Sequence, residues 1–170
     1  VGTDEAVDGP RLDLHVQGLH GDMDYLARHG TRRSRPGELE PGTVRVISAR
    51  MNYSPKNAAD SWQVMQDPRR GVISRYALGR DYHKVLRGRL QQLAQRIAHE
   101  AGSFRYRIFT DSAPVMEVEI ARNAGLGWRG KHTLLLSREA GSLFFLGEIY
   151  TDLPLPADPP REEHCGTCRK

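Results

Sequence analysis

The chain has 170 residues and a mass of 19.1 kDa, enough for one ordinary domain with a hydrophobic core. Its formal net charge is +4 and its isoelectric point is about 9.3, which permits an anionic partner such as RNA without requiring one. The sequence contains no run of about 18 apolar residues and no charged-then-apolar leader, so we expect neither a membrane-spanning helix nor secretion.

The first part of the chain predicts little regular structure. Residues 1–10 resemble a linker, and we expect that residues upstream are missing because the chain begins with Val1. Residues 22–29 predict a short helix that ends at a glycine. A basic loop follows over residues 31–42, with Arg32, Arg33 and Arg35. These arginines are typical of a solvated or phosphate-facing loop.

A strand and a long helix are expected next. Residues 44–53 are rich in β-branched side chains and predict a buried strand, and residues 54–71 predict a loop with two prolines. Residues 82–101 predict an amphipathic helix with Asp81 as its N-cap and Gly102 as its stop. Its apolar stripe consists of Leu86, Leu90, Leu93, Ile97 and Ala101.

Strands and helices alternate through the second half of the chain. We expect strands over residues 104–109, 133–136 and 143–150, and a helix over 115–123 with Pro114 in its first turn. This alternation favours an α/β or α+β domain of layered sheet and helices. The proline-rich residues 153–160 predict a rigid crossing into another module.

Asp111 is the principal candidate for chemistry, because it stands where a strand gives way to a turn. It has two interpretations. The carboxylate caps the helix that follows, which would lower its pKa; or it is a general acid kept protonated by burial beside Phe109, Val115 and Met116. In the second case Ser112 takes the capping role. In a polar cluster before the long helix, Arg75 and Arg80 are candidates for binding phosphate or amide groups. His83 is either a ligand or a surface histidine in the first helical turn.

A glycine-rich loop over residues 124–133 is the second candidate site. The spacing of Gly125, Gly127 and Gly130 matches a dinucleotide fingerprint, but the loop follows a helix and precedes a strand, which is the reverse of the required order. Such a loop suits a flat macrocycle, with Trp128 as a wall and Lys131 as a cation. The alternative is a tight turn with Trp128 in the core.

The only two cysteines, Cys165 and Cys168, form a C-x-x-C motif at the end of the chain. In a sequence without secretory signals this spacing favours metal or redox chemistry over a structural disulfide. The pair matches the first half of a C-x2-C-x2-C-x3-C-P iron–sulfur motif, which needs two more thiolates. We therefore expect that the chain is also truncated at this end.

Seven segments together resemble the epoxyqueuosine reductase family, which uses cobalamin and iron–sulfur clusters in tRNA modification. The segments span nearly the whole chain and are residues 21–29, 39–47, 73–83, 111–115, 124–133, 146–149 and 163–170. The resemblance implies a cobalamin-binding catalytic domain over residues 1–155, and a linker with the beginning of a ferredoxin-like 4Fe-4S domain over 156–170.

The resemblance also implies roles for individual residues. Asp111 becomes the catalytic proton donor, and Cys165 and Cys168 become ligands of one of two 4Fe-4S clusters. The implied cobalamin contacts are Arg35, Arg75, Ala77, Asp111, Met116, Gly127, Trp128, Gly130 and Lys131.

The implied reaction is the reduction of epoxyqueuosine to queuosine at the tRNA wobble position, by a cytoplasmic monomer. Its partners would be tRNAs with a GUN anticodon (Asp, Asn, His, Tyr) and an electron donor. Two alternatives stay open: a cobalamin-dependent reductive dehalogenase, and a non-catalytic RNA-binding or electron-transfer fragment. The basic loop and the lack of a leader count against the dehalogenase.

Overall fold

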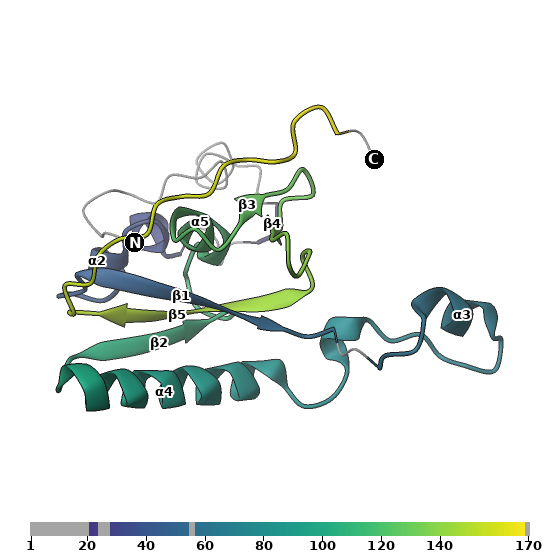
Figure 1. The fold of residues 1–170 in the computed structure, drawn as a ribbon, viewed down its shortest axis with the longest axis horizontal. Helices are drawn as coiled ribbons and strands as arrows, with labels where there is room; N and C mark the ends of the chain where they lie inside the picture. Colours follow the sequence, from purple (N-terminus) through teal and green to yellow (C-terminus); the bar gives the residue numbers. More distant parts are fainter. Residues whose placement is uncertain (1–20, 24–27, 55–56, 169–170) are drawn as a thin grey trace.

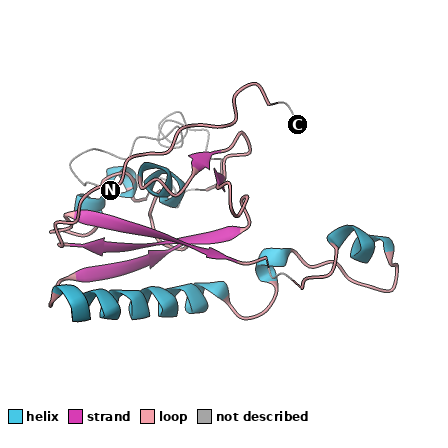
Figure 2. Cartoon of the chain, viewed as in Figure 1, coloured by secondary structure: helices cyan, strands magenta, loops and turns pink. Residues whose placement is uncertain are grey.

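The structure is a computed structural model and describes residues 21–23, 28–54 and 57–168. The predicted linker over residues 1–10 and the middle of the predicted helix over 22–29, residues 24–27, lie outside these ranges. Three strands form the central sheet in the order β1 (Arg45–Asn52), β5 (Phe144–Thr151) and β2 (Tyr106–Thr110). In this order the last strand in sequence lies between the first two (Figures 1 and 2). It pairs antiparallel with both of them.

Helices cover the two faces of this sheet. Helix α4 (Tyr82–Ala101) lies along one face. Helix α5 (Glu117–Asn123) and a small hairpin of β3 (Trp128–Arg129) and β4 (Leu135–Leu136) lie on the other (Figure 1). The expected layered α+β architecture is confirmed. No helix within the described ranges is both long and apolar enough to cross a membrane.

Helix α4 has the bounds that its sequence predicts. The Asp81 side chain accepts a hydrogen bond from the backbone N–H of His83, and Gly102 ends the helix with a φ of 88°. The buried stripe is Leu86, Leu90 and Ala94, packed against the central strand. The predicted stripe was wrong at two positions, because Leu93 and Ala101 are exposed.

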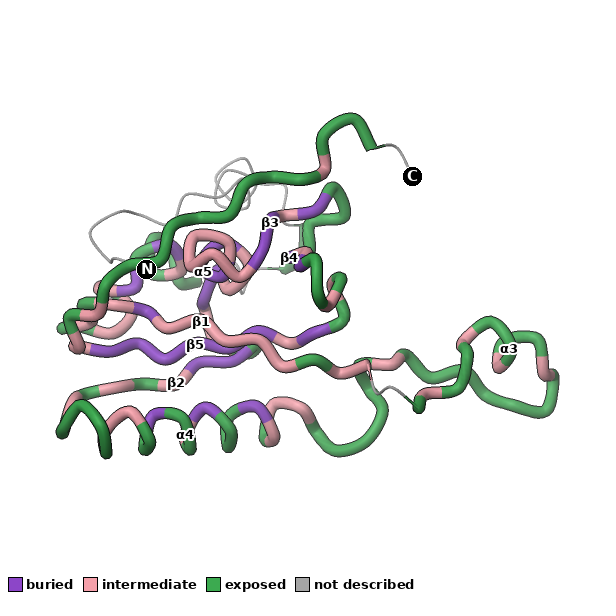
Figure 3. The backbone as a smooth tube through the Cα atoms, in the orientation of Figure 1, coloured by how far each residue is buried: buried purple, intermediate pink, exposed green. Residues whose placement is uncertain are grey.

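The opposite face of the sheet packs against α5. The core there includes Val46, Phe109, Ile120 and Tyr150. A neighbouring cluster joins Leu135 of the hairpin to the end of β5 that carries Phe144 and Leu146. Strand β5 is therefore buried on both faces, while the outer side of α4 and the segment around α3 are exposed (Figure 3).

Two predicted loops contain short helices. The predicted loop over residues 31–42 overlaps η2 (Gly30–Arg33) and contains α2 (Pro36–Leu39). Residues 54–71 hold α3 (Ser61–Gln66), which Asp60 caps, and η3 (Arg75–Ala77) follows. Elements this short contain too few residues to generate a recognisable apolar period, which explains why the sequence pattern predicted loops.

Candidate active site

Asp111 lies at the junction of two elements that are distant in sequence. It follows the last residue of β2, and its Oδ2 accepts a hydrogen bond from the Tyr82 hydroxyl at 2.5 Å. The Nε2 of His83 lies 3.3 Å from the same oxygen. Since Tyr82 and His83 form the first turn of α4, the packing of α4 on the sheet places a phenol and an imidazole beside the carboxylate.

The two partners of Asp111 have shifted proton affinities. Burial, and then the hydrogen bond to Asp111, raises the pKa of the Tyr82 phenol, so the phenol stays protonated at neutral pH and donates the hydrogen bond to Asp111. The Nδ1 of His83 lies 2.9 Å from Asp81 Oδ1. This hydrogen bond and the weaker one to Asp111 raise the pKa of His83. The charged imidazolium is thus favoured between two carboxylates.

The expected burial of Asp111 was wrong. Its side chain is 53% exposed, and Phe109, Val115 and Met116 instead pack in the core on the α5 side of the sheet. The capping alternative also fails, because the N-cap of α5 is Met116 and receives no side-chain hydrogen bond. Asp111 is an accessible carboxyl group whose immediate environment is set by two hydrogen-bonding neighbours.

Asp111 lines a cleft of about 190 Å³ with largely aromatic walls. Tyr82 stacks on Phe145 with ring centroids 3.9 Å apart and an interplanar angle of 1°. The other aromatic lining residues are Tyr53, Tyr76 and Phe144. A flat, unsaturated ring system suits such walls. The sequence analysis did not predict Tyr53, Tyr76 and Phe144 as site residues. Aromatic residues in strands and loops have no spacing that distinguishes a cleft wall from the core.

The arginines predicted to bind cofactor make local contacts. Arg35 pairs with Glu38 at 3.0 Å. Arg75 donates to the hydroxyls of Ser54 and Ser61, both at 3.1 Å, and so fastens the segment before α3. Ala77 lies at the exposed end of η3. Cofactor contacts from these residues remain predictions.

Two glycines of the glycine-rich loop pack tightly against the β3–β4 hairpin. A methyl group at Gly127 would overlap the carbonyl oxygen of Leu136, and one at Gly130 would lie 2.5 Å from the His132 ring. Trp128 is 9% exposed, as the tight-turn alternative predicts. Its indole N–H has no acceptor among the described residues. Lys131, in contrast, is exposed in the turn between β3 and β4.

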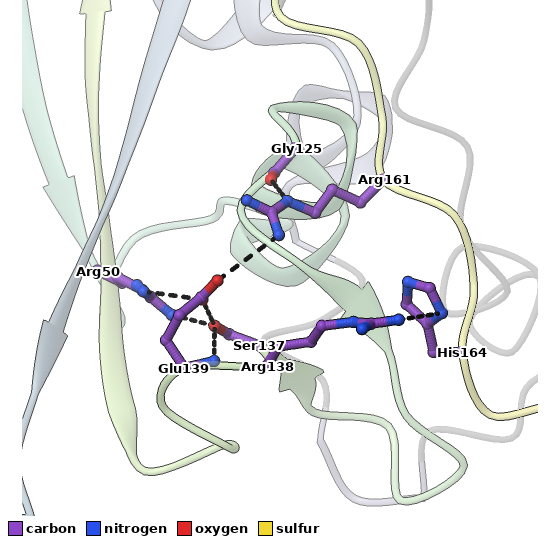
Figure 4. A network of polar contacts seen from close by, with 7 residues as sticks. All are labelled: Arg50, Gly125, Ser137, Arg138, Glu139, Arg161 and His164. Atoms are coloured by element: carbon purple, nitrogen blue, oxygen red, sulfur yellow. Dashed lines mark hydrogen bonds and ion pairs between the residues drawn. The ribbon is translucent and has the colours of Figure 1, made fainter.

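The C-terminal segment, residues 159–168, runs along α5 and the hairpin (Figure 1). Arg161 donates to the Gly125 carbonyl at 2.9 Å and pairs with Glu139 at 3.8 Å (Figure 4). The ring of His164 packs edge-on against Trp128, with centroids 4.9 Å apart, and its Nδ1 lies 3.2 Å from Arg138.

These contacts bring the two cysteines to the glycine loop. Lys131 Nζ donates to the carbonyl of Cys168, and the Cys168 N–H donates to the Cys165 carbonyl at 3.0 Å in a tight turn. Both thiols are free. The described residues contain no cluster of three or more His, Cys, Asp or Glu side chains placed to hold a metal ion.

Comparison with known proteins finds a family model and curated relatives that share one name, epoxyqueuosine reductase. Residues 33–112 match the family described as epoxyqueuosine reductase QueG, DUF1730. The epoxyqueuosine reductase of Xanthomonas campestris is 59% identical over 155 residues, which cover 91% of this chain and 44% of that protein. The enzyme of the same name from Pseudomonas aeruginosa is 60% identical over 162 residues, 92% of this chain and 45% of that protein.

Solved structures agree with these relatives. A selenomethionine-labelled epoxyqueuosine reductase has a TM-score of 0.81 and 27% identity, covering 100% of this chain and 45% of that one. A second such enzyme, with a tRNA-Tyr epoxyqueuosine-modified tRNA stem loop, has a TM-score of 0.77 and 26% identity, with coverage of 98% and 46%. A Bacillus subtilis enzyme, described with an aspartate-bearing catalytic loop swung out of the active site, has values of 0.75 and 26%, with coverage of 98% and 46%.

The chain belongs to the epoxyqueuosine reductase family. It spans about 44% of the length of the curated epoxyqueuosine reductases that it matches.

This family member also contains a buried acid that the sequence prediction did not single out. Glu148 is fully buried on the central strand β5, and neither of its carboxylate oxygens has a hydrogen-bond partner among the described residues. Burial, and then the charge of Glu117, raises the pKa of Glu148 well above its ordinary value. A buried carboxyl without a cation is more stable as the neutral acid.

The protonation of Glu148 predicts how stability changes with pH. An unfolded glutamate titrates near pH ~4.3. Because the pKa of Glu148 is higher in the folded state, its contribution to the free energy of unfolding is complete below the unfolded-state pKa. That contribution is lost as pH rises toward the folded-state pKa, by at most ~1.4 kcal/mol per pH unit. Glu148→Gln should flatten this fall in urea unfolding of the complete protein between pH 5 and 8. Glu100→Gln, exposed near the end of α4, is the control. Parallel wild-type and Glu148→Gln curves would contradict a neutral Glu148.

Proposed function

We propose that the complete protein reduces epoxyqueuosine to queuosine at the wobble position of tRNA, the final step of queuosine biosynthesis, in the cytoplasm. The observation that carries the proposal is the 60% identity to the Pseudomonas aeruginosa epoxyqueuosine reductase across 92% of this chain. The accessible acid Asp111, at the wall of an aromatic cleft, supplies a group of the type that the reaction needs.

The proposed redox cofactors are cobalamin and two 4Fe-4S clusters, which would deliver the electrons. The cleft is smaller than the ~300–1,000 Å³ typical of small-molecule pockets. Its mouth, however, presents exposed apolar surface at Tyr76 and Leu134. Tyr76 and Leu134 would form one apolar wall against cobalamin, and the cleft would not enclose the cofactor. The proposed polar contacts of the cofactor are Arg35, Arg75 and Lys131.

The remaining proposed cobalamin contacts differ in accessibility. Ala77 is exposed, whereas Met116, Gly127, Trp128 and Gly130 are buried. The buried positions would therefore shape the wall from behind, and Asp111 would face the reacting group. Since Gly127 and Gly130 pack against their own hairpin, their proposed role is to hold that wall in place.

Cys165 and Cys168 fit half of the ligand set of one cluster. A 4Fe-4S cluster takes four thiolates, and this chain has two cysteines, which lie in one turn beside the glycine loop. The other two ligands would have to come from residues that this chain does not contain.

The proposed role of Asp111 follows from the atoms that the reaction must balance. Removing an epoxide oxygen to leave an alkene breaks two C–O bonds and consumes two electrons and two protons, and the oxygen leaves as water. Asp111 would donate one proton to that oxygen as negative charge develops on it. Tyr82, which donates a hydrogen bond to Asp111, would orient the carboxyl group. His83, whose Nε2 lies 3.3 Å from the same oxygen, would return its proton.

His83 gives this mechanism a pH signature. Because hydrogen bonds to Asp81 and then Asp111 raise the pKa of His83 above its ordinary value, the imidazolium is lost at a higher pH than in a free histidine. We expect kcat/KM to fall along this alkaline limb in the wild-type protein, and the limb to be absent from His83→Gln. The exposed His99→Gln is the control. An unchanged limb in His83→Gln would exclude His83 from the proton path.

The proposed partners are tRNAs with a GUN anticodon (Asp, Asn, His, Tyr) and an electron-donor protein or reductant, and the proposed oligomeric state is a monomer. The structural relative described with a tRNA-Tyr stem loop supports the RNA substrate. The mildly basic charge of this chain is compatible with it.

The proposal is tested by mass spectrometry of tRNA nucleosides from cells with and without the gene. Accumulation of epoxyqueuosine together with loss of queuosine in the disrupted cells is the expected result. An unchanged nucleoside profile, in cells that make queuosine and have no second enzyme for the step, would refute it.

A further inference from the structure

Residues 57–80 form a projecting arm beyond the end of the central sheet. The arm carries α3 and η3, and Figure 1 shows α3 lying well away from the sheet and from α4. Helix α3 has no buried residue, and the tube around it is exposed with short stretches of intermediate burial (Figure 3). The arm therefore contributes little to the core described above.

The arm nevertheless has defined internal structure. Asp60 accepts hydrogen bonds from the backbone N–H groups of Trp62 and Gln63, which fixes the start of α3. Arg75 donates to Ser54 and Ser61 and so ties the two sides of the arm together at its base. A surface built in this way can present side chains in a fixed arrangement.

The exposed side chains of the arm are unusually apolar. Six of the eleven exposed large hydrophobic residues among the described ranges lie on it, and Trp62 is the most exposed of them at 73%. The other five are Met65, Val72, Ile73, Tyr76 and Leu78. Solvated apolar surface concentrated in one place marks an interaction site.

Cations accompany these apolar groups. Residues 57–80 contain four arginines against two aspartates. Arg69 pairs with Asp67 at 3.2 Å and Arg75 is used at the base. Arg70 and Arg80 are exposed, and the guanidinium group of neither forms a hydrogen bond or ion pair with the described part of the chain. Exposed aromatic rings beside free guanidinium groups are the combination that binds single-stranded nucleic acid, through base stacking and phosphate contacts.

The position of the arm links it to the candidate active site. Tyr76 lines the cleft that contains Asp111, and its ring packs edge-on against Tyr82 with centroids 6.5 Å apart. A nucleotide whose base enters the cleft would therefore have its neighbours beside the arm.

We propose that the projecting arm is an RNA-contacting surface, on which Trp62 stacks against an unpaired base of the anticodon loop while Arg70 and Arg80 contact its phosphates. This proposal rests on the proposed function, since it takes the tRNA anticodon loop as the ligand. An exposed indole and two cations on the same arm would help to hold the loop open around the wobble nucleotide.

The test is equilibrium binding of a fluorescein-labelled tRNA-Tyr anticodon stem-loop to the complete protein. Trp62→Ala should weaken binding about 10-fold, and Trp62→Phe, which keeps an aromatic face, should bind within about 3-fold of wild type. The double variant Arg70→Ala/Arg80→Ala should reduce the slope of log K against log salt by about 1.4. Leu93→Ala and Arg96→Ala, exposed on α4, are the matched controls and should bind as wild type.

The binding results distinguish a failure of the arm proposal from a failure of the reductase proposal. Wild-type affinity in Trp62→Ala overturns the arm proposal and leaves the reductase proposal intact. Wild-type affinity accompanied by a large loss of thermal stability in Trp62→Ala also overturns it, because the arm would then be covered by protein. Failure of wild type itself to bind the stem-loop refutes both proposals. Weakened binding in Trp62→Ala, with unchanged nucleosides in the gene-disrupted cells, supports the arm and refutes the reductase.

Discussion

Replacing Asp111 with Asn is expected to lower turnover of epoxyqueuosine-containing tRNA by about 10²–10⁴-fold, the usual contribution of a general acid. An amide of the same shape still accepts the Tyr82 hydrogen bond, but it has no proton to release at neutral pH. Because the side chain is 53% exposed, the substitution leaves the core packing unchanged. We therefore expect Asp111→Asn to fold normally and to retain cobalamin with wild-type corrin absorbance.

Single-turnover measurements on the reconstituted complete protein give this rate directly. Asp158→Asn is the matched control, because Asp158 is an exposed acid on the crossing before the C-terminal segment. Its turnover should equal that of wild type. Turnover of Asp111→Asn within a few-fold of wild type would remove Asp111 from the chemistry and leave the proton donor to another group.

The second large effect is expected at Gly127, where alanine should reduce the free energy of unfolding by about 3 kcal/mol. The added methyl group would overlap the backbone carbonyl of Leu136. Trp128 and Leu136 are paired across the hairpin of β3 and β4, so the overlap can be relieved only by separating the strands. The loss would appear as a lower urea midpoint of the complete protein.

Gly88→Ala is the control, because it should change the free energy of unfolding in the opposite direction. Gly88 lies exposed inside α4, and a methyl group there would meet nothing within 4 Å. Gly88→Ala should therefore stabilise the protein by about 0.5–1 kcal/mol, since alanine has the higher helix propensity. A wild-type urea midpoint for Gly127→Ala would mean that the hairpin tolerates the methyl group, and that Gly127 is glycine for another reason.

Much of the architecture could be predicted from local patterns. Helix α4 has an Asp81 cap, a Gly102 stop and a regular apolar period, and these signals agree with one another. Strand β1 was predicted to within one residue at each end. The order of the strands could not be predicted in this way, because pairing β5 between β1 and β2 depends on contacts between residues far apart in sequence.

The candidate site was only partly predictable for the same reason. Asp111 was identified from its position after a strand, but its neighbours Tyr82 and His83 belong to a helix that precedes that strand. Glu148 gave no signal either, because a single glutamate in an apolar strand has the same sequence pattern whether it faces solvent or the core. Its burial follows from the coverage of β5 on both faces.

The most direct measurement is the nucleoside content of tRNA from gene-disrupted cells that express either the wild-type protein or Asp111→Asn at equal levels. We expect that the wild-type protein restores queuosine and that Asp111→Asn leaves epoxyqueuosine accumulated. Restoration of queuosine by Asp111→Asn at the wild-type level would contradict the assignment of Asp111 as the proton donor.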